Sequence, residues 1–286
     1  MLAGILLALI GLGDVVRART GADAHRQRTL TTIAVVVLWA GVSAVAWLGL
    51  GVPVWGVLVT VVLAAAWIAT TAPVRAGTGT ADDDDHDAPT TRGLLRRSGS
   101  WPAVLLALAV AVLLLWGPLP DGTGFVVDWH DGSGLAFVDA VPLAAVVGGV
   151  GSALFLVDSA NVVVAQALPP GLQRGATTGA EADDLRRRFG RRRRADADAE
   201  QSGDSTVSLK GGRLIGPIER LLLAGFAMAG AFPVVAALIA AKGIVRFPEI
   251  RRETTGYQAE YFLIGSLVSW AMAFAAAGMC WLLAHS

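Results

Sequence analysis

Charged side chains interrupt apolar sequence mainly in the last third of the chain, where they could bind an ion or a phosphate. Glu219 and Arg220 precede an apolar segment, and Lys242 follows it. Ionisable groups are costly inside a membrane, so those that border apolar segments are the best pointers to a functional site. If the chain reverses near Ala231, Glu219 comes level with Lys242. We therefore predict a charge cluster at the cytoplasmic membrane boundary, made of Glu219, Arg220, Lys242, Arg246, Glu260 and Tyr261.

Pairing within this cluster follows from helical spacing. Lys242 and Arg246 share one helical face, so both could point at one acidic partner. We expect Glu219 to pair with Lys242, and Arg220 to lie beside Arg246 or Glu260. Two interpretations stay open: the charges attach a hairpin to the last helix and extend to the interface, or their cations form a site for an ion or an anionic headgroup.

Patterns typical of catalysis and metal binding give little support for an enzyme. No Gly-x-Ser-x-Gly, His-Glu-x-x-His or P-loop occurs, and Cys280 is the single cysteine. The acidic run at residues 82–87 lacks the turn glycine of a calcium loop, so we interpret it as solvated. Asp128, His130 and Asp131 are interpreted as part of an interfacial turn with a Trp anchor. We predict no catalytic residues, no metal ligands and no cofactor.

Composition indicates the environment of the elements that position these residues. Of the 286 residues, 54% are hydrophobic and 16% are charged, and the mean hydropathy is +0.59. No ionisable side chain occurs between Arg28 and Arg75, or between Arg97 and Asp121. A water-soluble helix needs a polar face opposite its apolar one. The formal net charge of +0 excludes a global field for nucleic-acid binding.

The fold class that follows is an all-α polytopic membrane protein without a soluble domain. We predict about six spans plus a C-terminal helical hairpin, which makes seven to eight apolar helices. The spans are placed at residues 2–16, 30–50, 54–73, 101–116, 135–157 and 261–284, and the hairpin at 214–247. Residues 1–168 form an N-terminal membrane region, 169–213 a basic disordered loop, and 214–286 a C-terminal membrane region.

Several finer expectations accompany these spans. Residues 2–16 could instead form an interfacial helix, and a signal peptide is disfavoured because a basic n-region and a cleavage site are missing. The small residues at 148–152 offer a face for close helix packing. Asp158 and Asn161 are expected to cap the end of the 135–157 span or to be solvated at the interface, and a polar path is the alternative. Asp14 is expected to meet lipid headgroups.

Basic residues determine the expected orientation. All but one of the 23 Lys and Arg residues lie in the loops at 17–29, 74–100, 169–213 and 242–257. Because basic loops stay cytoplasmic, the segment between the last two loops must return to the side from which it started. A hairpin with its tip near Phe232 satisfies this condition, whereas one ordinary span does not.

The longest basic run also indicates a partner. Its arginines lie next to a membrane segment, where each adds roughly 1 kcal/mol of attraction to anionic headgroups. With Phe189 as its one aromatic residue, the run is a poor site for nucleic acid. The arginines expected to contact lipid are Arg186, Arg187, Arg188, Arg191, Arg192, Arg193 and Arg194.

Three C-terminal blocks carry a resemblance to known proteins. They run from Gly212 to Arg220, from Ala240 to Phe247 and from Glu260 to Ser269. Their residues follow the patterns Gly-Arg-x-Ile-Gly-x-x-Glu-Arg, Ala-Ala-Lys-x-Ile-x-Arg-Phe and Glu-Tyr-x-Leu-Ile-Gly-x-x-x-Ser. This part of the chain resembles a family of bacterial multi-pass membrane proteins of uncharacterised function. Gly243 and Ser266 depart from the family pattern, which has Ser at the first of these positions and Thr at the second. The resemblance implies a bacterial plasma membrane and transfers no activity.

Three classes of function follow from these observations. A non-catalytic scaffold, sensor or assembly component is favoured, with a homo-oligomer or another membrane protein as partner. The alternative is a transporter or channel that uses the broken hairpin at 214–247. A membrane-embedded enzyme is the second alternative. It would require a pocket that joins the charge cluster to a proton donor such as Tyr261.

Overall fold

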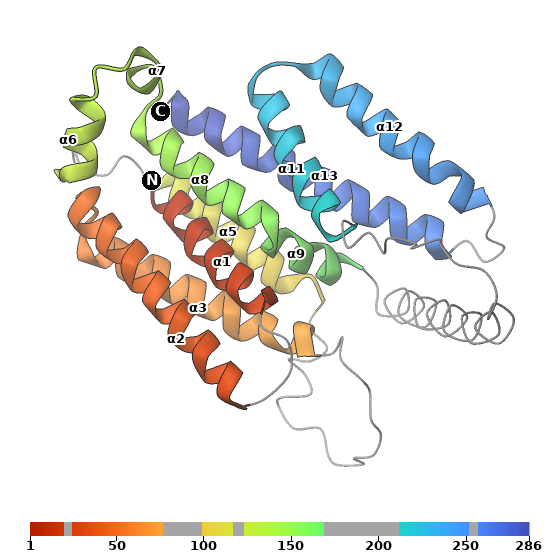
Figure 1. The fold of residues 1–286 in the computed structure, drawn as a ribbon, viewed down its shortest axis with the longest axis horizontal. Coiled ribbons are helices and arrows are strands. Elements are labelled where there is room, and N and C mark those ends of the chain that lie inside the picture. Colours follow the sequence, from red (N-terminus) through yellow and green to blue (C-terminus); the bar gives the residue numbers. More distant parts are fainter. Residues whose placement is uncertain (20–24, 77–98, 117–122, 169–211, 252–256, 286) are drawn as a thin grey trace, which may run out of the picture.

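The computed structural model describes residues 1–19, 25–76, 99–116, 123–168, 212–251 and 257–285. Within these ranges all regular structure is helical, in agreement with the predicted all-α class. The predicted loops at 74–100 and 169–213, with the seven lipid-contacting arginines, lie almost entirely outside the described residues. Figure 1 shows one helical bundle with the hairpin α11–α12 along one side.

Three helices are long and apolar enough to cross a membrane, at Thr29–Gly49, Val54–Thr71 and Phe262–Ala284. They belong to α2 (His25–Ala44) with the π-helical turn η1 (Val45–Gly49), to α3 (Val54–Ala76) and to α13 (Tyr257–Ala284). A fourth span exists if the bent pair α8 (Leu143–Val157) and α9 (Ser159–Ala167) is counted as one. The predicted number of about six spans plus a hairpin is therefore not confirmed.

The remaining predicted spans fall short for identifiable reasons. α5 (Trp101–Leu115) has 15 residues, about 22 Å by the helical rise, against a bilayer core of about 30 Å. The apolar part of α12 is similarly short, at Phe232–Val245, but it was predicted as one arm of the hairpin and not as a span. The span predicted at 135–157 begins later, because Pro142 caps α8 and the short helix α7 (Ala136–Asp139) precedes it.

The helix α1 (Leu2–Arg19) forms the centre of the bundle. Its apolar side chains are buried between α2, α3, α5 and α8, and Leu6, Leu9 and Ile10 are inaccessible to solvent. This packing contradicts the interfacial alternative for residues 2–16, since an interfacial helix keeps one face in water. Figure 1 shows α1 between α8 on one side and α2 and α3 on the other.

Glycines bring α1 and α8 into close contact. A Cβ on Gly4 would lie 2.7 Å from the Val147 carbonyl oxygen, and one on Gly11 would lie 2.6 Å from the Leu154 carbonyl carbon. A Cβ on Gly151 would collide with the backbone of Gly4. The predicted close-packing role of the small residues at 148–152 is therefore confirmed.

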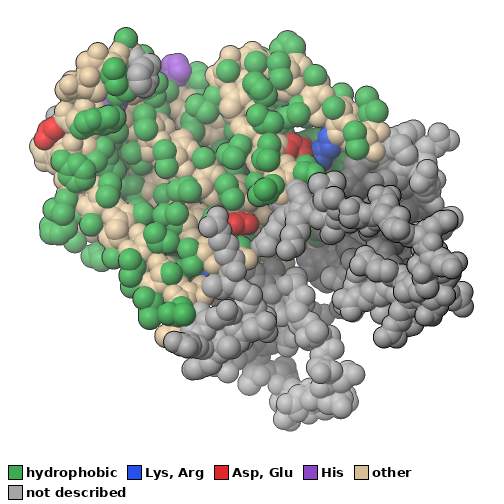
Figure 2. Space-filling view, viewed as in Figure 1, with side chains coloured by type: hydrophobic (Ala, Val, Ile, Leu, Met, Phe, Trp, Pro, Cys, Tyr) green, Lys and Arg blue, Asp and Glu red, His purple; other side chains and the backbone are tan. Residues whose placement is uncertain are grey.

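Hydrophobic side chains cover much of the outer surface. Figure 2 shows them spread across one face of the described chain, with few charged side chains between them. Trp47 and Trp55 are about half exposed next to the turn between η1 and α3, and Trp55 lies 6.2 Å from Trp116 between ring centroids. An apolar exterior with tryptophans at one end is typical of a membrane protein.

Candidate functional site

The C-terminal hairpin positions the predicted charges. α11 (Gly212–Met228) and α12 (Phe232–Arg251) are joined by a turn in which Gly230 has a φ of 69°. Glycine adopts this left-handed conformation without the steric cost that other residues incur. The chain thus reverses just before Phe232, where the tip of the hairpin was predicted.

Glu219 on α11 and Lys242 on α12 form an ion pair across the hairpin. The Lys242 Nζ lies 2.9 Å from Glu219 Oε1 and 2.8 Å from Oε2. The indole N–H of Trp270, on α13, donates to the same Oε1 at 2.9 Å. The Glu219 and Lys242 side chains are 12% and 25% exposed, so the pair is largely removed from solvent. The predicted pairing of Glu219 with Lys242 is present.

Aromatic rings complete the surroundings of Lys242. Its Nζ lies 5.7 Å from the ring centroid of Trp270 and 6.0 Å from that of Phe262. Such distances allow a cation–π attraction in addition to the ion pair. Within the described residues, the ammonium is therefore held by one carboxylate and two aromatic rings, an arrangement suited to fastening α12 to the bundle.

Arg220 belongs to a separate buried site. Its Nε donates to Ser269 Oγ at 2.8 Å, its Nη1 to the Leu156 carbonyl oxygen at 3.0 Å, and its Nη2 to Asn161 Oδ1 at 2.7 Å. The residue is 5% exposed. Arg220 was predicted to lie beside Arg246 or Glu260. The Glu260 alternative is wrong, because the guanidinium meets α13 at Ser269, more than two helical turns beyond Glu260, and the side chain of Arg246 lies outside the described residues.

The reason for this site is the break between α8 and α9. The two helices meet at 58°, and the break occurs at Asp158. A break of this kind leaves carbonyl groups at the end of α8 without their helical donors. Arg220 supplies a donor to one of them, and a cation at a helix C-terminus is also favourable electrostatically. Asp158 is the C-cap residue of α8, as predicted, although its side chain makes no capping hydrogen bond to α9. The Asn161 amide donates to the Val157 carbonyl oxygen at 3.5 Å, also at the end of α8, and its Oδ1 accepts from Arg220.

The predicted boundary cluster is thus divided. Glu219 and Arg220 contact Trp270 and Ser269 respectively, so neighbouring residues of α11 meet neighbouring residues of α13. Glu260 is exposed. The side chains of Arg246 and Tyr261 lie outside the described part of the structure, as do Arg186, Arg187, Arg188, Arg191, Arg192, Arg193 and Arg194.

Asp14 is a buried carboxylate whose contacts the sequence did not reveal. It is fully buried, accepts a hydrogen bond from the Trp67 indole N–H at 3.1 Å, and lies 3.4 Å from Arg17. The prediction that Asp14 meets headgroups is therefore wrong. An acidic residue near the end of an apolar segment was its only signal in the sequence, and the position of its partner on α3 depends on tertiary packing.

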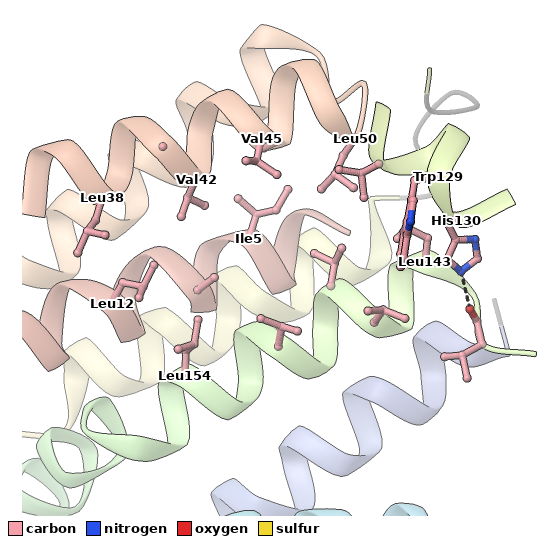
Figure 3. A pocket seen from close by; sticks show the side chains of 18 of the residues that line it. Ile5, Leu12, Leu38, Val42, Val45, Leu50, Trp129, His130, Leu143 and Leu154 are labelled. Carbon is pink, nitrogen blue, oxygen red and sulfur yellow. Dashed lines mark hydrogen bonds between the residues drawn. The ribbon is translucent and has the colours of Figure 1, made fainter. Parts of the chain in front are cut away.

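A wide apolar groove lies between α1, α2 and α8. Its volume is about 780 Å³, and helix α6 (Phe125–Asp131) closes one end. Figure 3 shows aliphatic side chains lining the groove and Trp129 with His130 at that end. The His130 ring lies 3.0 Å from the Val141 carbonyl oxygen through Nε2 and 3.2 Å from Asp131 through Nδ1. Asp128, His130 and Asp131 belong to helix α6, so the predicted interfacial turn is a short helix.

The chain matches no protein-family model, no curated protein and no solved structure. The likeness of the C-terminal blocks to a bacterial membrane-protein family therefore stays a prediction from the sequence. Within the described residues, no three His, Cys, Asp or Glu side chains gather as metal ligands would.

Proposed function

We propose that this chain is a non-catalytic assembly component of a bacterial plasma membrane, in which α12 docks against a second copy of the chain. The observation that supports the proposal is the position of α12. Its main helical contact is with α11, whereas α13 packs against α8, α9 and α11. Figure 1 shows α12 at the margin of the bundle.

One face of α12 packs inward and the other is open. Val235, Leu238 and Ile239 pack against α11 and α13, while Ile244 and Val245 are 73% and 72% exposed. The Glu219–Lys242 pair holds α12 in this position, so its exposed apolar face is fixed relative to the bundle. Lipid could cover this face, but lipid does not account for the short apolar part of α12.

The length of the hairpin favours a protein neighbour. The apolar part of α12 spans about 21 Å by the helical rise, less than the bilayer core of about 30 Å. A hairpin that enters from the cytoplasmic side would then place its turn at residues 229–231 within the hydrocarbon region. Non-helical backbone at that depth is tolerated where protein or water covers it. A second copy of the chain would provide this cover.

The same argument assigns topology and lipid contacts. In this proposal all basic loops are cytoplasmic, and α1 and α8–α9 cross the membrane beside α2, α3 and α13. Although α5 is about as short as the apolar part of α12, it is proposed to cross as well, because it joins the basic loop at 74–100 to the segment 117–134, which has no Lys or Arg. The arginine-rich run at 186–194 then contacts anionic headgroups on the cytoplasmic side. Single cysteines at residues 200, 231 and 254 in a Cys280→Ala background test this: we expect 200 and 254 to be labelled only from the cytoplasm.

Disulfide cross-linking in native membranes tests the docking of a second copy. We expect Ile244→Cys, in the Cys280→Ala background, to form cross-linked dimers on mild oxidation. Val36→Cys is the matched control, since Val36 is also an exposed aliphatic residue (58%) but lies on α2. Equal cross-linking of both variants, or of neither, would refute the proposal.

The cysteine at residue 231 distinguishes the alternative function. Residue 231 shielded from water-soluble reagents, together with cross-linking at 244, supports assembly. Residue 231 labelled from the water phase without cross-linking at 244 would instead favour a transporter or channel, since water would then cover the turn of the hairpin.

A further inference from the structure

The apolar groove at α1, α2 and α8 has the features of a lipid site, and we infer that it binds one hydrocarbon chain of a phospholipid whose headgroup carries an ammonium. This inference is independent of the assembly proposed for α12. It rests on the shape of the groove, on its access from outside the protein, and on the charges at its closed end.

Shape and lining fit a hydrocarbon chain. The groove follows α8 from Leu143 to Leu154, about 16 Å by the helical rise. Its volume of about 780 Å³ lies in the range of small-molecule sites. Along this length the lining is aliphatic, with Ile5 and Leu12 of α1 on its floor. Among the described residues that line the groove, His130 is the one with a titratable side chain.

Access is lateral, from the surface that would face lipid. The residues along the edges of the groove are substantially exposed, with values of 63% for Val37, 45% for Val45 and 56% for Val150. Trp129, at the closed end, is 61% exposed. A chain could therefore enter sideways from the bilayer and place its headgroup beside Trp129 and His130, at the level where indoles prefer to lie.

Charge at the closed end selects the headgroup. Asp128 and Asp131 are both exposed on α6, next to the lining residues Trp129 and His130. No Lys or Arg occurs between Arg97 and Arg174, a stretch that includes α5 to α9. The local charge is thus acidic, which favours an ammonium group and disfavours a headgroup with a net negative charge. Phosphatidylethanolamine has this chemistry, and phosphatidylglycerol lacks it.

Gly41 offers a substitution that fills the groove without disturbing the backbone. It lines the groove on α2, and a Cβ at this position meets nothing within 4 Å. A phenyl ring built there would occupy the space of the proposed chain. Gly278 on α13 provides the matched control, because a Cβ there also meets nothing within 4 Å and Gly278 does not line the groove.

The experiment uses the full chain in lipid nanodiscs with a phosphatidylethanolamine probe that carries a diazirine at the end of one acyl chain. After irradiation, peptide mass spectrometry locates the adducts. We expect the adducts to concentrate at the end of the groove opposite α6, near Leu12, Leu38 and Leu154. A phosphatidylglycerol probe with the same chain should give at least fivefold fewer adducts there.

The variants test the binding of the acyl chain and the preference for the headgroup separately. Gly41→Phe should lower the adducts in the groove at least fivefold, and Gly278→Phe should leave them unchanged. Asp128→Asn with Asp131→Asn should remove the preference for phosphatidylethanolamine. Adducts spread evenly over the exposed helices of the unmodified chain, or equal labelling by both probes, would overturn the inference whether or not the variants fold.

Discussion

Replacement of Arg220 by methionine should destabilise the protein markedly, although it removes a charge from the interior. A buried ion is costly, and exchanging a whole buried ionic group for apolar residues is often neutral or stabilising. Arg220→Met is a different case, because the acceptors remain. The Leu156 carbonyl and the Asn161 side chain would each lose the donor that binds them in the unmodified protein.

The magnitude follows from these acceptors. Leaving a buried acceptor without its donor costs about 1–3 kcal/mol. The Ser269 hydroxyl can rotate towards its own helix, so its loss adds little. The buried Leu156 carbonyl therefore gives about 1–3 kcal/mol. Asn161 is exposed, so its Oδ1 can find another donor and adds less, and the apolar packing of methionine offsets part of the loss. We expect Arg220→Met to lower the free energy of unfolding by about 2 kcal/mol, mainly because of the unpaired carbonyl.

Two further variants determine whether hydrogen bonding is the cause. Arg220→Lys keeps the charge but lacks the planar fork that reaches three acceptors, so it should recover no more than half of the loss. Arg220→Met combined with Asn161→Leu and Ser269→Ala should be more stable than Arg220→Met alone, because fewer acceptors are left unpaired.

The assay is reversible unfolding of the full chain in mixed micelles, followed over a titration with dodecyl sulfate. A loss below about 0.5 kcal/mol for Arg220→Met, the level of an ordinary surface substitution, would refute the reasoning. So would full recovery by Arg220→Lys, since the charge alone would then explain the stability.

The same assay checks three other predictions. Glu219→Leu should destabilise more than Glu219→Leu with Lys242→Met, by about 2 kcal/mol, because the single change leaves an uncompensated ammonium; equal losses would contradict the ion pair. Gly4→Ala should lose about 1–3 kcal/mol, since its Cβ would meet the backbone of α8. Gly41→Ala, with open space around its Cβ, should cost less than about 0.5 kcal/mol, and the glycine argument fails if both variants behave alike. Asp14→Leu should cost about 2 kcal/mol, because it leaves the indole N–H that it binds without an acceptor; a stability equal to that of the unmodified chain would refute this.

The sequence by itself determined the all-α class, the reversal of the chain near Phe232 and the pairing of Glu219 with Lys242. These conclusions depend on local composition and on short-range spacing. An uncharged apolar run must form helix in a membrane, and two residues at equal distances from a tight turn must come level. Neither inference requires knowledge of how distant helices pack.

Only the tertiary structure decided the partners of Arg220 and Asp14 and the central position of α1. Arg220 meets a carbonyl group that is free because α8 breaks at Asp158, and the break lies far from Arg220 in sequence. Asp14 is buried because Trp67 of α3 packs over it. Contacts of this kind depend on the order and the rotation of helices in the bundle, and the hydrophobic pattern is too uniform to specify either, because nearly every face of these helices is apolar.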